Sequence, residues 1–179
     1  MRLCGSLVAT ALLAALALGG QDKPVKAPDF SAKGSDGKTH TLASLTKKDK
    51  PVLFYFIGNT CPINAMAIPY FKQIEKAYKG KVNFVGVIDG DEEIYKDWNK
   101  EFKTSFTVLY DPDFEMIKKF KALASPWAVL VSPDGEIVQT MSGYSDKSLQ
   151  SLISAMAKQG KTQPVKIDTS AAPEDDMFG

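Results

Sequence analysis

The chain has 179 residues, of which 44% are hydrophobic, 10% aromatic and 24% charged. This composition is typical of a globular protein with one well-filled core, and it excludes a disordered, collagen-like or disulfide-stapled chain. The formal net charge is only +1, so no charge excess directs the protein to nucleic acid or an anionic membrane. Two cysteines, Cys4 and Cys61, and one histidine, His40, offer too few ligands for a typical metal site, so we expect no metal and no cofactor.

The first twenty residues have the anatomy of a secretory signal peptide. Arg2 precedes an apolar run from Leu7 to Leu18, and two glycines stand before a polar stretch. A membrane-spanning helix needs about 20 apolar residues, and this run is shorter, although an uncleaved anchor stays an alternative. We therefore expect cleavage near Gly20 and a periplasmic or secreted protein without stable membrane insertion. Cys4 would be lost with the signal, which leaves one cysteine in the mature chain.

Strands and helices are predicted to alternate along the mature chain. In chain order, the predicted elements are a hairpin over residues 29–45 with an Asp36-Gly37 turn, a strand over 52–57, a helix over 62–79, a strand over 82–89, a helix over 91–103, a strand over 107–110, a helix over 113–121, strands over 127–131 and 136–141, and a helix over 145–160. The run Val52–Ile57 is entirely apolar and aromatic, as in a central strand covered on both faces.

This order of elements predicts the α/β class, with helices on both faces of a central mixed sheet. The first strands would be parallel, and the two strands joined by the turn at Ser132–Gly135 would be antiparallel. One domain over residues 21–160 suffices, with the N-terminal hairpin as an extension. Residues 161–179 are polar and unpatterned, so we expect them to form a flexible C-terminal tail.

Cys61 is the residue that the sequence singles out for chemistry. It follows the loop Gly58–Thr60 and precedes Pro62, which suits the first position of a helix, so we expect Cys61 to be the helix N-cap. There its sulfur could accept hydrogen bonds from the amides of Ile63 and Asn64, and the helix dipole would favour the thiolate. The alternative is that Cys61 is a small buried hydrophobic residue, as most unpaired cysteines are.

The segment Cys61-Pro62-Ile63-Asn64, placed between a buried strand and a helix, resembles the active-site segment of thioredoxin-like proteins. Further residues that match are Pro69 within the helix, Ser125-Pro126 before a strand, Ala27-Pro28-Asp29-Phe30 and Val108-Leu109-Tyr110-Asp111. The chain is most similar to the extracytoplasmic redoxins, the TlpA-like and AhpC/TSA peroxiredoxin-like proteins. This resemblance implies a thioredoxin-like three-layer sandwich and a cis Ser125-Pro126 bond that faces the cysteine.

The resemblance also implies roles for individual residues. The expected catalytic residues are Cys61, Pro62, Asn64 and Pro126, and the expected substrate-binding residues are Ser125, Trp127 and Thr60. The Ser125 backbone would pair with an extended substrate peptide while Cys61 attacks its disulfide. We expect Trp127 to belong to the core or to the wall of the substrate groove and not to act as a catalytic group.

The sequence departs from the family pattern at the second cysteine. Thioredoxins carry a resolving thiol three residues after the first, and this chain has Asn64 there. We therefore expect a single-cysteine redoxin in which Cys61 forms a mixed disulfide or a sulfenic acid. An external thiol would have to resolve it, so the expected partners are such a reductant or the disulfide of a substrate protein.

Three other functions stay open from the sequence. A peroxiredoxin site has Thr or Ser three residues before its cysteine and an arginine that holds the peroxide, whereas this chain has Gly58 there and no arginine after Arg2. Slow peroxidase chemistry is one alternative. A second is a thioredoxin-fold module that has lost catalysis and binds an extracytoplasmic protein. A third is copper handling through Cys61 and Met66.

Overall fold

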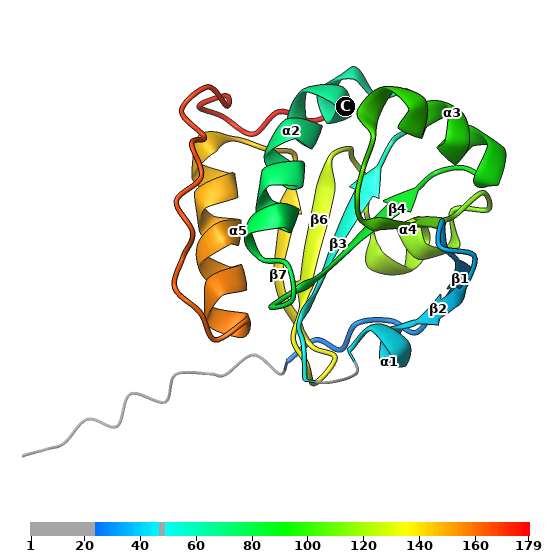
Figure 1. Ribbon diagram of the computed structural model, residues 1–179, viewed down its shortest axis with the longest axis horizontal. Helices are drawn as coiled ribbons and strands as arrows, with labels where there is room; N and C mark the ends of the chain where they lie inside the picture. The colour runs from blue at the N-terminus through cyan, green and yellow to red at the C-terminus, as the bar shows by residue number, and fades with distance from the viewer. Residues whose placement is uncertain (1–23, 47–48) are drawn as a thin grey trace, which may run out of the picture.

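The structure is a computed structural model that describes residues 24–46 and 49–179; the expected signal peptide lies outside the described residues. A five-stranded sheet of order β5-β4-β3-β6-β7 lies at the centre (Figure 1). Its strands are β3 (Val52–Ile57), β4 (Asn83–Ile88), β5 (Thr107–Tyr110), β6 (Trp127–Val131) and β7 (Ile137–Ser142). The helices are α1 (Leu42–Leu45), α2 (Pro62–Ala77), α3 (Glu92–Phe102), α4 (Glu115–Phe120) and α5 (Asp146–Gln159). A hairpin of β1 (Ser31–Lys33) and β2 (Thr39–Thr41) precedes them.

Strand directions follow the expectation of a mixed sheet. The strand β3 pairs in parallel with β4, and β4 pairs in parallel with β5. The strand β6 runs antiparallel to both β3 and β7. Because all six residues of β3 are buried, this strand is the centre of the sheet, as its unbroken apolar sequence indicates.

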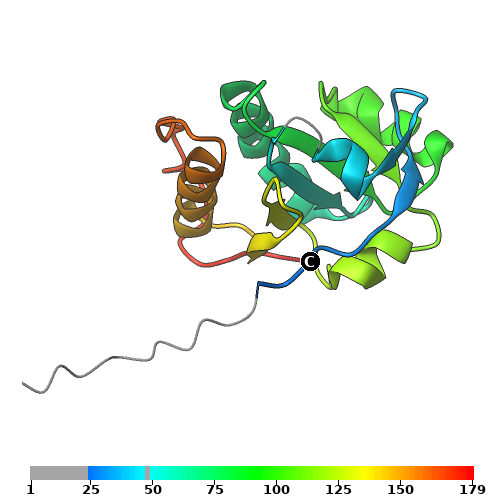
Figure 2. The same cartoon turned by 90° about the horizontal axis from the view of Figure 1, so that it is seen from below.

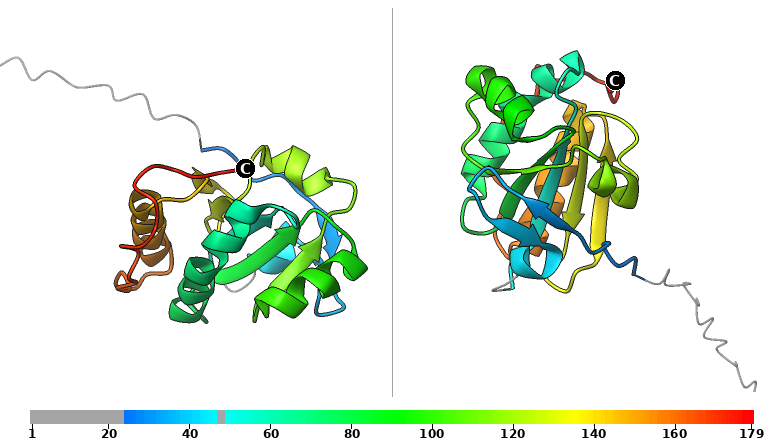
Figure 3. Two further views of the ribbon diagram at one scale, coloured as in Figure 1. Left: turned by 90° about the horizontal axis from the view of Figure 1, so that it is seen from above. Right: turned by 90° about the vertical axis from the view of Figure 1, so that its right-hand side faces the viewer.

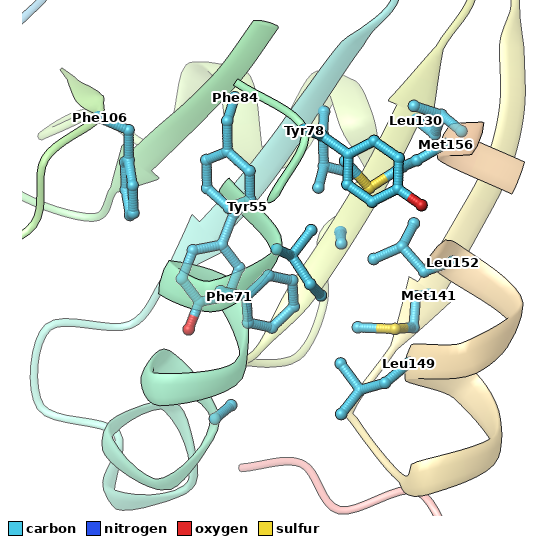
Figure 4. Close-up of a cluster of buried hydrophobic side chains, with 14 of the residues drawn as sticks. Tyr55, Phe71, Tyr78, Phe84, Phe106, Leu130, Met141, Leu149, Leu152 and Met156 are labelled. Carbon is cyan, nitrogen blue, oxygen red and sulfur yellow. The ribbon is translucent and has the colours of Figure 1, made fainter. Parts of the chain in front are cut away.

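Each face of the sheet carries its own hydrophobic core. The side chains of Leu53, Tyr55 and Ile57 point to the face covered by α2, α3 and α5. Figure 4 shows this core, in which Tyr55 stacks on Phe71 from α2 with ring centroids 3.9 Å apart. The alternate residues of β3 face α4 and the segment around the N-terminal hairpin, which lie away from α5 in Figure 2. The result is a three-layer sandwich, as predicted.

The register of the sheet gathers several loops at one edge. Parallel strands β3 and β4 both end there, so the loop to Cys61 and the residue Asp89 are neighbours. The pairing of Phe56 with Trp127 brings the start of β6 to the same edge, because β6 runs in the opposite direction. Loops from distant parts of the sequence therefore meet where β3 ends.

The path of residues 161–179 differs from the flexible tail expected from the sequence. Ile167 and Thr169 are buried, and Gln150 of α5 donates to Thr169 Oγ1 at 2.7 Å. The chain then returns along α5, and its end lies beside the first turn of α2 (Figure 1, Figure 3). Ile167 joins the core beside α5, and Val165 and Ala172 pack against that core. Polar side chains and backbone groups hold the rest of the segment, so no apolar periodicity could reveal it.

Smaller differences concern the limits of elements. The helix α2 ends at Ala77, two residues before the predicted limit, and the four-residue helix α1 falls within the segment expected to be only extended. Thr41 caps α1 by accepting from Ser44 N at 3.2 Å.

Within the part of the chain that the structure describes, no helix is both long enough and apolar enough to cross a bilayer.

Candidate active site

Cys61 is the N-cap of α2 and is partly exposed, as its position before Pro62 predicts. Its N–H donates to Gly58 O at 3.1 Å, which closes the loop between β3 and α2. The sulfur, however, accepts no hydrogen bond from the start of the helix, contrary to our expectation. Its S–H instead donates to the carbonyl oxygen of Ser125 at 3.5 Å.

The Ser125-Pro126 peptide bond is cis, as the resemblance implies, and Ser125 faces Cys61. The Ser125 hydroxyl accepts from Gly58 N at 2.9 Å and from Asn64 Nδ2 at 3.0 Å, which ties this loop to both sides of the cysteine. A Cβ atom at Gly58 would lie 3.1 Å from both Cys61 Cβ and Ser125 Oγ. The absence of a side chain at position 58 therefore permits the two loops to come this close.

Asn64 belongs to a buried chain of hydrogen bonds directly beneath the cysteine. Only 1% of its surface is exposed. Its Oδ1 accepts from the Tyr55 hydroxyl, and its Nδ2 donates to Ser125 Oγ. Burial raises the pKa of Tyr55 well above its ordinary value, with smaller contributions from Cys61 and Tyr144, so its hydroxyl stays protonated and available as a donor. Asn64 is thus buried, with both ends of its side-chain amide hydrogen-bonded.

A cavity of about 270 Å³ opens beside the sulfur. Its lining includes Phe56, Thr60, Asp89, Phe114, Leu123 and Gly179. Leu123 is 85% exposed and Phe114 44% exposed, although both side chains are large and apolar. Among the described residues that line this cavity, none is a lysine, arginine or histidine. The site therefore offers an apolar surface next to a thiol.

The structure brings together most of the residues predicted for the site. Cys61 and Ser125 are in contact, Pro126 is buried behind them, Asn64 lies beneath, and Thr60 lines the cavity. Pro62 is exposed at the first position of α2.

Trp127 has a different environment from the one expected of a substrate-binding residue. Its side chain packs on the core that faces α4 and does not line the cavity. Its Nε1 is buried and has no hydrogen-bond partner within the described residues. The reason is the alternation of β6, which directs Trp127 to the opposite face from Ala128.

Sequence reasoning missed most residues of the cavity lining, and four of them, Asp89, Phe114, Leu123 and Gly179, show why. Asp89 could have been found, because it directly follows a buried parallel strand, and it accepts from Asn59 N at 2.7 Å. Phe114 and Leu123 gave no such signal, since apolar residues near a short helix are typical of core positions. Gly179 lies in the segment expected to be a loose tail.

Two kinds of curated relatives are similar to the chain. The thiol-disulfide oxidoreductase ResA of Bacillus subtilis is 27% identical over 138 residues, which are 76% of each chain. ResA of Bacillus thuringiensis is 28% identical over 124 residues, which are 68% of this chain and 70% of the relative. The chloroplastic peroxiredoxin Q of Populus jackii is 28% identical over 103 residues, covering 58% of this chain and 48% of that protein.

Solved structures show the same fold. A structure from Chlorobium tepidum, named as a thiol:disulfide interchange protein DsbE, has a TM-score of 0.70 and 23% identity and covers 78% of this chain and 98% of its own. The exposed lipoprotein thioredoxin Etrx1 of Streptococcus pneumoniae has a TM-score of 0.61 and 24% identity and covers 73% of this chain and 99% of its own. The fold is therefore thioredoxin-like. Residues 25–140 match the AhpC/TSA family, to which this chain belongs.

Proposed function

We propose that the protein is a thiol-disulfide exchange protein in which Cys61 is the only redox nucleophile. The observation that carries this proposal is the contact between the partly exposed thiol of Cys61 and the cis Ser125-Pro126 loop, beside an apolar cavity. The ResA relatives, which are named thiol-disulfide oxidoreductases, support the same reaction class.

The proposed reaction has two exchange steps. The Cys61 thiolate attacks one sulfur of a substrate disulfide, a mixed disulfide forms, and the other substrate sulfur leaves as a thiolate. The thiolate of an external molecule then attacks the substrate sulfur in the mixed disulfide, and Cys61 leaves as a thiolate. Asn64 cannot carry out the second step, because it has no sulfur. The external thiol therefore ends in a disulfide with the substrate, and the protein returns unchanged.

Two observations favour a disulfide over a peroxide as the substrate. Stabilising the charge on a departing peroxide oxygen calls for positioned donors or cations, and no cationic side chain lines the described cavity. The hydroxyl that peroxiredoxins carry three residues before their cysteine would need a Cβ at Gly58, which would crowd Cys61 and Ser125. An apolar surface and an adjacent backbone carbonyl suit a peptide substrate better.

We place this reaction outside the cytoplasm. The support comes from the leader-like residues 1–20 of the sequence. Disulfides persist in extracytoplasmic compartments, so a lone thiol there would meet both substrate disulfides and small thiols. The proposed partners are accordingly a protein disulfide and an external thiol reductant.

The test uses the full chain with a Cys4→Ser substitution, so that Cys61 is its only thiol. The folded protein is mixed with oxidised glutathione, and the mixed disulfide is followed by intact mass. The same chain unfolded in urea is the reference, because it has the same thiol without the site. We expect the folded chain to react faster and to release its adduct when dithiothreitol is added. A Cys61→Ser variant should form no adduct.

The proposal would be contradicted if neither the full chain nor a variant that ends at Asp176, which exposes Cys61, reacts faster when folded than when unfolded. The alternative of a non-catalytic binding module would then explain an unreactive Cys61 better. Hydrogen peroxide provides the second arm of the experiment: faster oxidation of Cys61 by peroxide than by the disulfide would move the assignment to the peroxidase reaction.

A further inference from the structure

Residues 177–179, which we call the end strand, lie beside Cys61 as an extended segment. Met177 N donates to Tyr144 O and Tyr144 N donates to Met177 O, both at 3.0 Å. Gly179 N donates to Ser125 O at 2.8 Å, and Ser125 N donates to Gly179 O at 3.0 Å. Residues that exchange both of their backbone hydrogen bonds in this way form an antiparallel ladder. The end strand thus adds itself to two loops at the edge of the site through its backbone.

The preceding residues deliver the end strand to this place. Asp146 N donates to Pro173 O at 2.9 Å, and the Ser145 hydroxyl donates to Asp176 Oδ1 at 2.7 Å. Both contacts are made at the start of α5, close to the loop that contains Tyr144. The views of Figure 3 agree that the chain end lies next to the first turn of α2.

Gly143 permits the close approach of the end strand. Its φ of +73° lies in the left-handed region that favours glycine, and a Cβ there would stand 2.6 Å from Met177 O. Gly143 N in turn donates to Pro126 O at 2.9 Å. This hydrogen bond joins the loop of Gly143 and Tyr144 to the cis-proline loop, so the end strand can pair with both loops.

Position 179 lies directly on the sulfur of Cys61. A Cβ atom built on Gly179 would be 3.0 Å from Cys61 Sγ. In a disulfide the Cβ of one cysteine lies about 3 Å from the sulfur of the other, given an S–S bond of about 2.05 Å. A cysteine at this position of the strand would therefore have its Cβ where a mixed disulfide with Cys61 needs it.

We propose that the end strand occupies the binding site of an extended substrate peptide, with Gly179 at the place of the substrate's cysteine. This inference rests on the proposed function, and it takes the extended substrate peptide from the resemblance; its new part is that residues 177–179 occupy the same site. The substrate is a disulfide whose cysteine lies in an extended segment that pairs with Ser125, while the residue two positions earlier pairs with Tyr144. It also gives the site a regulator, because the end strand must leave before such a peptide reaches Cys61.

The first experiment shortens the chain, in the Cys4→Ser background, so that it ends at Asp176. The probe is a synthetic peptide of residues 173–179 with the Gly179→Cys substitution, joined through that cysteine to thionitrobenzoate, whose release is coloured. We expect the shortened chain to react about tenfold faster than the full chain, which is the scale of one net hydrogen bond. Met177→Pro removes the N–H that binds Tyr144 O and should act in the same direction without shortening the chain.

Thermal unfolding of both variants verifies that they are folded. The inference is overturned if both folded variants react with the peptide probe at the rate of the full chain.

The second experiment places a thiol in the end strand itself. Gly179→Cys should form an intramolecular disulfide with Cys61 under mild oxidation by oxidised glutathione. Ala171→Cys, which puts an exposed thiol on the same returning segment, is the matched control. Disulfide formation in the Gly179→Cys variant that is no faster than in the control would contradict the proposed position of the substrate cysteine.

The two proposals fail in different ways. If the full and the shortened chains react equally fast with the peptide probe, the end strand does not cover the site, and disulfide exchange by Cys61 still stands. If shortening speeds the reaction of Cys61 with iodoacetamide while the peptide disulfide fails to react, the end strand covers the thiol, and the proposed exchange function is the part that is wrong.

Discussion

At the scale of single residues, Asn64 holds the position at which thioredoxins carry a second cysteine. Its buried amide joins Tyr55 to Ser125, and the Ser125 carbonyl in turn accepts from the thiol of Cys61. Buried polar groups such as these stabilise a site only when all of them are paired. Changes within this chain of hydrogen bonds should therefore affect both stability and the reactivity of the thiol.

A Tyr55→Phe substitution tests this coupling. It removes the donor to Asn64 Oδ1 and leaves that buried oxygen unpaired, so we expect the free energy of unfolding to fall by about 1–3 kcal/mol. Urea denaturation measures the loss, and alkylation by iodoacetamide measures Cys61. Tyr78→Phe is the matched control, because its buried hydroxyl donates to Ile153 O, away from the site. The control should lose stability without a change in alkylation rate; equal rates in the two variants would refute the coupling.

An Asn64→Cys substitution should supply the missing resolving thiol. We expect the variant to form an internal disulfide with Cys61 and to release a trapped mixed disulfide without added thiol, since the two positions are three residues apart at the start of α2. Intact mass after reaction with oxidised glutathione follows the release. Met66→Cys puts an exposed thiol on the same helix and should retain the adduct. Persistence of the adduct in both variants would contradict the expectation.

At the scale of elements, one exposed carboxylate connects the N-terminal hairpin to α3. Glu92 accepts from Lys33 of β1 and from Lys96 of its own helix, each at 2.8 Å. These two lysines lower the pKa of Glu92 to about 2. Because the folded state favours the ionised carboxyl, its contribution to stability is present above the ordinary pKa of 4.5 and is lost as the pH falls from there toward 2.

Glu92→Gln should therefore weaken the acid dependence of stability between pH 4.5 and 2. The effect should be small and should shrink in high salt, because both ion pairs are exposed to solvent. Urea unfolding of the variant and the parent at several pH values measures it. Glu93→Gln, one residue along the same turn and outside these ion pairs, is the control. An unchanged pH profile in the Glu92→Gln protein would show that the pairs do not stabilise the fold.

At the scale of the whole molecule, the leader-like residues 1–20 lead to a prediction about export. When the full chain is produced in a bacterium that exports proteins, we expect the mature protein to begin near Gln21 and to leave the cytoplasm. Intact mass of the fractionated protein measures the new N-terminus. A Leu13→Arg variant, which interrupts the apolar run, should keep its leader. Recovery of the parent chain with Met1 in the membrane fraction would instead support an anchor.

The sequence was sufficient for the parts of the molecule that depend on local patterns. The apolar run of β3 and the helical spacing of α2 predicted a buried strand followed by a helix, and the thioredoxin-like arrangement followed from the resemblance. Cys61 and Ser125, sixty-four residues apart, were expected to meet only by that resemblance. Limits of elements were off by a residue or two, because end residues depend on hydrogen bonds that propensity does not encode.

The remaining features depend on contacts that no local pattern records. Leu123 and Phe114 look like core residues in the sequence, and only the path of the loops leaves them at the cavity. The segment after α5 is held by a few separate apolar contacts, such as that of Ile167 with the core, and by polar groups of other elements, such as the Gln150 side chain on Thr169. Its polar composition therefore predicted a loose tail, although the structure places its last residue against Cys61.

The buried amide at position 64 affects the redox capacity of the domain. A protein with two neighbouring thiols can store a pair of electrons, and the couple has a midpoint potential of its own. Under the proposed function this domain owns no such couple, since Asn64 fills the second place and is sealed beneath the site. The fraction of Cys61 that carries an adduct would then simply follow the ratio of thiols to disulfides in the surrounding fluid, so the domain would transmit that balance without setting it.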